Sequence, residues 1–158
     1  MIKKKIKILY ICVLLISLTS CGFKKINKIH NNTIYIQNIN IIGEPSIAYP
    51  LKNNILLISS NNSDDKYDLK IKIQKKRTDK IKDKAGRVTR YNLSVTADLQ
   101  LININNKIIS KTFVKDSDYE VAKIHSKTIN NQNNATKNIV QQLAEDIIYF
   151  VTLSVRNK

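Results

Sequence analysis

The sequence predicts an α/β (α+β) fold, a two-layer sandwich in which two helices pack on one face of a four-stranded mixed sheet. Two segments alternate apolar and polar residues with the period of two that is typical of a strand with one buried face. The last segment repeats apolar residues at steps of three and four, the period of an amphipathic helix. The predicted order is strand, helix, strand, strand, strand, helix, and one helical layer on one sheet buries all the apolar faces.

Residues 1–20 have the pattern of a secretory signal peptide. Lysines precede an uncharged apolar run at 8–18, and the sequence Leu18-Thr19-Ser20-Cys21 matches the bacterial lipobox. The run is too short for a spanning helix, which needs about 20 residues. We therefore expect cleavage before Cys21, which would carry a diacylglycerol and an N-acyl lipid such as palmitate, and several acyl chains give stable anchoring. The alternative is a buried cysteine after a hydrophobic helix.

The first half of the mature chain predicts a tether, a strand and a helix. Residues 21–32 are rich in Lys and Asn and indicate a lipidated tether, followed by a single domain over 33–158. Residues 33–42 are apolar and β-branched, which favours a strand. Pro45 and Pro50 bracket residues 46–49, and helical spacing predicts a helix at about 49–60. An Asn-Ser-Asp segment at 61–65 predicts a loop.

The second half predicts three strands and a long helix. Residues 67–74 alternate, and 91–101 give the clearest alternation in the chain, so we expect a long strand that twists or projects beyond its neighbours. Residues 103–106 predict a turn, and 107–115 return as the hairpin partner. Residues 131–155 carry the helical apolar stripe and contain no Gly or Pro.

The composition favours anionic neighbours without naming one. The formal net charge is +15, and four lysines of the signal peptide contribute to it. Lys, Ile and Asn are all encoded by A/T-rich codons, so part of the lysine excess reflects composition alone. Export removes nucleic acid as a partner, and the abundant anions outside the inner membrane are phosphorylated lipids and lipopolysaccharide. Cys12 would leave with the signal peptide, so no disulfide is expected.

No motif supports an enzyme, a metal site or a bound cofactor. His30 falls in the tether and His125 near a turn, without further ligands at metal-site spacing. Asp64 and Asp65 are typical of a polar turn, and Ser94 lies on the polar face of a strand. We therefore expect no catalytic residues, no metal and no cofactor other than the lipid on Cys21.

The densest charge in the sequence lies between Lys75 and Arg90, which we interpret as a loop between two strands. It holds eight basic residues against two acidic ones. Arg offers bidentate geometry and Lys a point charge, so such a loop is suited to phosphates. The alternative is a solvated hairpin loop in a lysine-biased protein.

Three features together resemble one known family. They are the start Cys21-Gly22-Phe23, the stretch from Gly86 to Ala97 with its Thr-Arg-Tyr-x-Leu segment, and the amphipathic C-terminal helix. They are similar to the lipopolysaccharide-assembly lipoprotein family LptE, above all its alphaproteobacterial branch. One departure is Lys24-Lys25-Ile26, where that branch often has an Arg-Pro-Leu-Tyr-like run.

The resemblance implies a fold, a partner and a ligand. Members of the family have two helices on a four-stranded sheet, plug the outer-membrane β-barrel protein LptD, help it assemble and bind lipopolysaccharide. It implies a non-enzymatic protein that is lipid-anchored at the periplasmic side of the outer membrane. By analogy it places lipopolysaccharide binding on Lys75, Lys76, Arg77, Lys80 and Arg87. A competing hypothesis is a generic envelope lipoprotein that binds peptidoglycan or another envelope protein.

Overall fold

The domain consists of one mixed sheet and two helices. The computed structural model describes residues 35–57, 59 and 66–156. Its elements in chain order are β1 (Tyr35–Ile42), α2 (Pro45–Leu56), β2 (Lys66–Lys82), β3 (Val88–Asn103), β4 (Ile108–Glu120) and α3 (His125–Arg156). This order and the mixed sheet confirm the predicted fold class.

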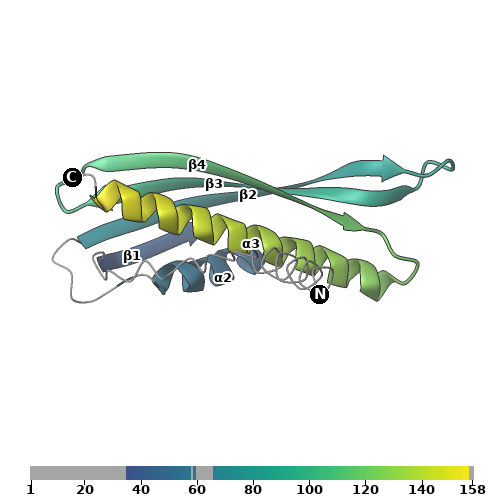
Figure 1. Cartoon of the computed structure of the whole chain (residues 1–158), viewed down its shortest axis with the longest axis horizontal. Helices are drawn as coiled ribbons and strands as arrows, with labels where there is room; N and C mark the ends of the chain where they lie inside the picture. Colours follow the sequence, from purple (N-terminus) through teal and green to yellow (C-terminus); the bar gives the residue numbers. More distant parts are fainter. Residues whose placement is uncertain (1–34, 58, 60–65, 157–158) are drawn as a thin grey trace, which may run out of the picture. The chain divides into compact units, whose positions relative to one another are not determined.

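The strands lie in the sheet in their chain order, β1-β2-β3-β4. β1 and β2 are parallel, and the other two pairs are antiparallel. Antiparallel neighbours can be joined by tight turns, whereas a parallel pair needs a crossover connection. The chain between β1 and β2 supplies that crossover and contains α2 (Figure 1).

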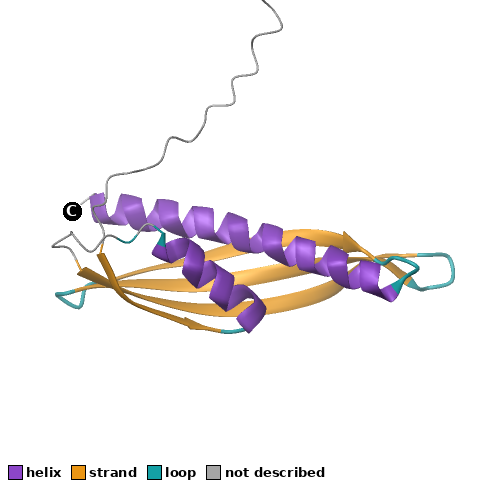
Figure 2. Ribbon diagram, turned by 90° about the horizontal axis from the view of Figure 1, so that it is seen from below, coloured by secondary structure: helices purple, strands orange, loops and turns teal. Residues whose placement is uncertain are grey.

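Both helices cover the same face of the sheet (Figure 2). The buried positions of β2 and β3 form one core with the stripe of α3, in which Ile139, Leu143 and Ile147 have no exposed surface. The ring of Phe113 in β4 packs edge-on against Phe150 of α3, with the centroids 5.8 Å apart. The first half of β2 and most of β3 therefore have one buried face, as their alternation predicts.

β2 and β3 are longer than the alternation predicts, and the interpretation of Lys75–Arg90 as a loop is wrong. β2 continues to Lys82, and its pairing with β3 runs from Tyr67 opposite Asn103 to Lys82 opposite Val88. The far half of β2 is exposed or half-buried, so its side chains keep no apolar alternation. The two strands project there as a twisted hairpin (Figure 1).

Both helices begin earlier than their apolar patterns. α2 starts at Pro45, not near residue 49, because a proline is tolerated in the first helical turn. The buried stripe of α2 is Ile47, Leu51 and Ile55. Burial of these side chains stabilises the helix despite the backbone hydrogen bond that Pro50 cannot donate. α3 starts at His125, six residues before the predicted Asn131.

The early start of α3 depends on polar contacts that a periodicity argument does not detect. The Ala122 backbone N–H donates to the Thr128 hydroxyl oxygen at 2.9 Å. The Asn131 side-chain amide donates to the Glu120 carbonyl oxygen at 3.0 Å. These bonds join the polar first turns of α3 to the end of β4, so the helix extends beyond its apolar stripe.

The turn from β1 into α2 requires glycine. Gly43 has a φ of 146°, a conformation that side chains rarely adopt. A Cβ at this position would lie 2.7 Å from both the Cβ and the carbonyl oxygen of Ile73. The absence of a side chain therefore allows the start of α2 to pass directly over β2.

The N-terminal predictions concern residues that the structure does not describe. The signal peptide, the lipidation of Cys21, the tether of 21–32 and His30 all lie outside the described residues. Among the helices of the described part, none has the length and hydropathy needed to cross a membrane.

Candidate functional site

The β2–β3 hairpin closes with a tight turn built around Asp83. The backbone N–H groups of Ala85 and Arg87 both donate to Asp83 Oδ1 at 2.9 Å, and Arg87 Nε donates to Oδ2 at 2.8 Å. The N–H of Arg87 is the main cause of a lowered pKa at the Asp83 carboxyl. Gly86 has a φ of 78°, which suits a residue without a side chain. The turn is thus held by its own short-range bonds.

The turn between β3 and β4 has the same bonding pattern at the opposite end of the sheet. There the N–H groups of Asn105 and Lys107 donate to Asn103 Oδ1 at 3.0 and 2.9 Å. Asn106 has a φ of 59° where the first turn has Gly86. A neutral amide therefore supports this conformation, so the turn at Asp83 needs neither its carboxylate charge nor the arginine for its shape.

Arg87 is a highly accessible cation placed by that turn. Its side chain is 80% exposed, whereas that of Asp83 is 28% exposed. Asp83 accepts from Nε, and a guanidinium has further N–H donors on its terminal nitrogens. These remaining donors have the geometry that binds a phosphate or carboxylate through two parallel hydrogen bonds.

Several other basic residues of the hairpin have acidic partners. Lys80 pairs with Asp118 on β4, and Arg90 bonds Glu120 at 2.5 Å. The hydrogen bond from Lys80, together with one from Asn92, lowers the pKa of the Asp118 carboxyl. Lys82 lies 3.1 Å from Asp79. Their charge is thus partly neutralised within the domain.

Arg77 and Lys75 point to the face of the sheet that carries the helices. The Arg77 guanidinium lies 4.7 Å from the ring centroid of Tyr91, a cation–π contact, and a hydrogen bond to Tyr119 raises its pKa. Lys75 donates to Glu44 Oε1 at 2.7 Å, and its side chain is only 18% exposed. Both cations therefore serve contacts within the domain.

The structure does not bring the five predicted binding residues together in one loop. Because successive side chains of a strand point to opposite faces, Lys75 and Arg77 face the helices while Lys76 and Lys80 face the other side. Arg87 lies in the turn itself. Of the five, Arg87 is the residue at the very end of the hairpin.

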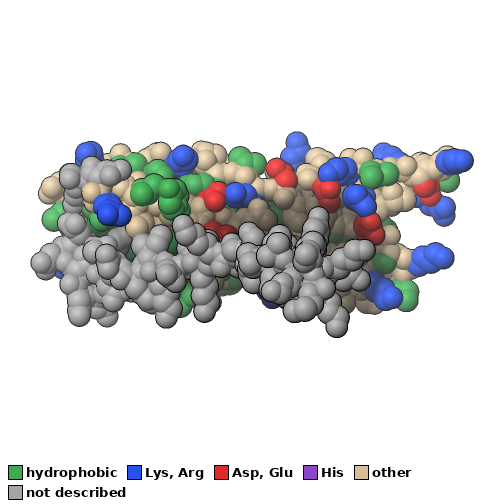
Figure 3. Space-filling model, viewed as in Figure 1, with side chains coloured by type: hydrophobic (Ala, Val, Ile, Leu, Met, Phe, Trp, Pro, Cys, Tyr) green, Lys and Arg blue, Asp and Glu red, His purple; other side chains and the backbone are tan. Residues whose placement is uncertain are grey.

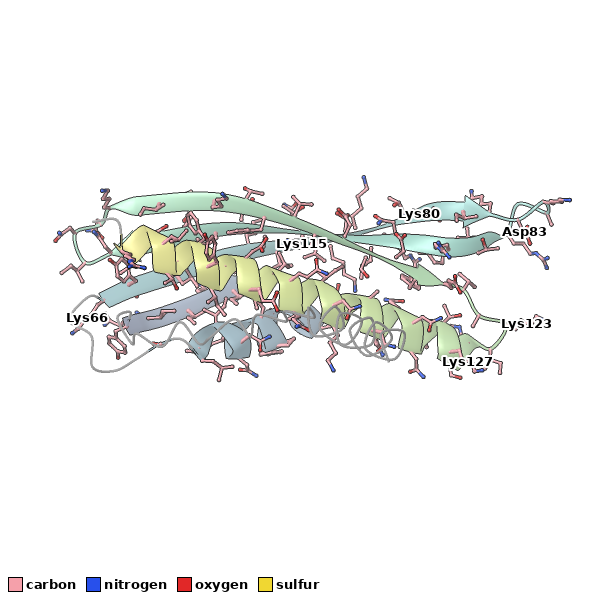
Figure 4. The ribbon with its side chains drawn as sticks, viewed as in Figure 1. Lys66, Lys80, Asp83, Lys115, Lys123 and Lys127 are labelled. Atoms are coloured by element: carbon pink, nitrogen blue, oxygen red, sulfur yellow. The ribbon has the colours of Figure 1, made fainter. Side chains whose placement is uncertain are left out.

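Three basic residues at this end of the domain lie outside the set of five predicted binding residues, although Lys84 belongs to the charge-dense segment. Lys84 lies in the turn, Lys123 in the connection from β4 to α3, and Lys127 in the first turn of α3. Figure 4 places Lys123 and Lys127 at the same end as Asp83, and Figure 3 shows Lys and Arg side chains there at the right. Some 40 residues separate Lys84 from Lys123 in the chain, so no local pattern predicts that they lie at the same end of the domain.

The other features of the described residues give no sign of catalysis. A cavity of about 760 Å³ between α2 and α3 is lined by both apolar residues, such as Pro50, Val140 and Ile148, and polar ones. His125 is exposed at the start of α3. Within 35–57, 59 and 66–156, no group of His, Cys, Asp and Glu has the arrangement of a metal site.

Solved structures with the same architecture come from several bacteria. Rare lipoprotein B from Shewanella oneidensis has a TM-score of 0.58 at 11% identity, over 76% of this chain and 97% of that one. A minor lipoprotein from Acinetobacter baumannii has a TM-score of 0.52 at 16% identity, over 75% and 91%. Lipoprotein B from Nitrosomonas europaea has a TM-score of 0.53 at 12% identity, over 79% and 88%. At these identities the likeness concerns the fold.

The family assignment comes from sequence. No curated protein matches the chain. The model of the family LptE, described as lipopolysaccharide-assembly, matches residues 32–150, which include every strand and most of α3. The chain therefore belongs to the LptE family, non-enzymatic lipoproteins of the outer membrane that act in lipopolysaccharide assembly with the barrel protein LptD.

Proposed function

We propose that this protein is the lipid-anchored partner of LptD in its own cell. In this proposal residues 1–20 are removed on export, Cys21 is acylated, and residues 21–32 tether the domain of 33–158 to the periplasmic side of the outer membrane. The lipobox before Cys21 supports the anchor. The family match begins at residue 32, which supports the boundary between tether and domain.

The position of the first strand favours a domain that extends away from its anchor. β1 begins at Tyr35, opposite Lys66 at the start of β2, whereas the turn at Asp83 follows the other end of β2. β2 has 17 residues, and at about 3.3 Å per residue it spans roughly 55 Å. A tether entering at Tyr35 therefore leaves the hairpin tip free to reach into the barrel, whose lumen is polar.

The proposed lipopolysaccharide site is the basic end of the domain. It centres on Arg87 and includes Lys80, Lys84, Lys123 and Lys127. The observation that carries this assignment is the 80% exposed Arg87 side chain on a turn whose shape does not depend on it. These cations would compete with divalent cations for the phosphates of lipid A and so loosen lipopolysaccharide aggregates, without making or breaking a covalent bond.

Three of the residues that the resemblance places in the site lie farther from the tip. Lys75 and Arg77 are held by Glu44 and Tyr91, and Lys76 faces the uncovered side of the sheet. We propose that Lys75 and Arg77 support the hairpin and that Arg87 makes the first contact with phosphate.

Charge reversal at the tip tests this site. We expect Arg87→Glu to weaken lipopolysaccharide binding at least about tenfold, because a charged hydrogen bond contributes about 1.5–3 kcal/mol. Lys107→Glu, in the equivalent turn at the opposite end, is the matched control and should bind as the unmodified protein does. Binding would be measured with purified full-length protein and purified lipopolysaccharide, after thermal denaturation has shown equal stability.

Equal affinities of the tip variant and the unmodified protein would contradict the proposed site. Equal losses in the tip variant and in Lys107→Glu would contradict it too, because such losses would indicate a response to net charge rather than to position.

A further inference from the structure

The sheet has one face that no described element covers. Both helices lie on the other face (Figure 2), so the even-numbered side chains of β2, β3 and β4 point outward. In β2 these positions carry mostly lysine, and in β3 from Asn92 to Gln100 they carry neutral polar residues apart from Asp98. In the far half of β4 they carry carboxylates. Charge on this face therefore changes from basic on β2 to acidic on β4.

Four lysines on β2 form a row along this face, hereafter the lysine row: Lys66, Lys70, Lys72 and Lys76. All four are exposed, and none has an ion-pair partner among the residues that the structure describes. On β3, Lys70 and Lys76 lie opposite neutral residues. Lys72 lies opposite Asp98, which accepts a 2.6 Å hydrogen bond from the Thr112 hydroxyl. The one acidic residue between these lysines, Asp68, accepts from the Asn38 amide at 2.9 Å.

Compositional bias does not explain this distribution. A general excess of lysine would place lysines at exposed positions of every strand. On the same face, β3 between Asn92 and Ile102 and β4 between Ile108 and Glu120 have no outward lysine. The lysines that β4 does carry, Lys111 and Lys115, face the helices, where Lys115 pairs with Asp146 at 2.7 Å.

The spacing of the lysine row matches that of a second strand. Alternate residues of a strand lie about 6.6 Å apart, and packed sheets lie about 10 Å apart. Lys70 and Lys72 are alternate residues of β2, and Lys66 and Lys76 lie two such steps beyond them at either end. The residues of a barrel strand that face the lumen alternate in the same way. One such strand could therefore meet the row position by position.

We propose that the lysine row is the surface that docks on the inner wall of the partner barrel, against a strand with carboxylates at alternate, lumen-facing positions. This inference rests on the proposed function, because it takes the barrel as the partner. Complementary charge across such a contact fixes its register and disfavours wrong partners. The row would thereby orient the domain in the lumen, with the helices on the opposite side.

The geometry favours a protein strand over a lipid phosphate as the occupant. Phosphate sites gather several donors on one group and favour the bidentate arginine. The lysine row contains no arginine, and its ends are ten strand residues apart, so its ammonium groups do not converge on one point. A row of separate point charges is suited to a row of separate carboxylates.

The test compares two charge-reversed proteins of equal net charge. In the first, Lys70 and Lys72 are replaced by Glu; in the control, Lys52→Glu and Lys137→Glu change exposed positions of α2 and α3 on the opposite side. Each full-length protein is co-expressed with the tagged barrel, and the retained fraction is measured after detergent extraction. We expect the row variant to lose at least about tenfold in retention, and the control to match the unmodified protein.

The outcomes separate this inference from the proposed function. Retention of the unmodified protein together with equal retention of both variants would overturn the docking surface and leave the partnership intact. Failure of the unmodified protein to co-purify would overturn the partnership itself. If the row variant kept the barrel but lost lipopolysaccharide, the row would be a phosphate surface and the inference would be wrong. High salt should also lower the retention of the unmodified protein on the barrel, because salt screens paired charges.

Discussion

Glu44 and Lys75 join the first turn of α2 to the middle of β2. Glu44 accepts from Lys75 at 2.7 Å and from the Ser46 hydroxyl at 2.7 Å, and the bond from Lys75 is the main cause of its lowered pKa. The sequence could predict neither partner, because 31 residues separate the two and each is an ordinary surface residue by composition. The cation–π contact of Arg77 with the ring of Tyr91 was equally unpredictable from the sequence. Such pairs depend on the register of the sheet.

The lowered pKa of Glu44 predicts a pH-dependent contribution to stability. Its ordinary value is 4.5, and the value in the folded protein is lower. The carboxylate therefore stabilises the fold fully above that ordinary value and loses this effect as the pH falls through the folded pKa. We expect Glu44→Gln to have a smaller free energy of unfolding than the unmodified protein at neutral pH, and the difference to vanish in strong acid.

Urea unfolding of both proteins at a series of pH values measures this difference. A gap between the two proteins that stays constant from neutral to strongly acidic pH would contradict the assignment, since the contribution would then not depend on ionisation of the carboxyl.

The strands and helices were predictable wherever they bury an apolar face. The alternation of β3 and the stripe of α3 both correspond to buried residues. Prediction failed at the far half of β2 and the first turns of α3, which are elements without such a face. There the backbone pairing with β3 and the polar contacts of Thr128 and Asn131 maintain the structure. A hydrophobic pattern carries no information about either.

The stripe of α3 gives a direct test of the two-layer packing. Leu143 has no exposed surface, so Leu143→Asp would bury a charge without a partner at a cost of several kcal/mol. This is comparable with the total stability of a domain, about 5–15 kcal/mol, and we expect the domain to unfold. Circular dichroism would detect the loss, with Gln142→Asp on the exposed side of the same helix as the control.

A soluble Leu143→Asp protein with an unchanged spectrum and an unchanged melting temperature would contradict the packing. Unfolding of the Gln142→Asp control would also do so, because that position would then have to be buried.

The elongated domain separates its proposed contacts in space. The chain enters at Tyr35, the basic end lies beyond the other end of β2, and the lysine row runs along the uncovered face between them. The order of elements was sufficient to predict the sandwich, because one sheet and two amphipathic helices have few ways to bury their faces. The composition of the basic end was not predictable, because Lys84 and Lys123 come to the same end of the domain only when the strands pair.

Native mass spectrometry of detergent-solubilised outer membranes is the most direct test of the partnership with the barrel. With the full-length protein expressed from its own sequence, we predict a one-to-one complex with LptD, in which this chain begins at Cys21 and carries the mass of its acyl chains. A chain that is found only alone, or with another envelope component in place of the barrel, would contradict the account.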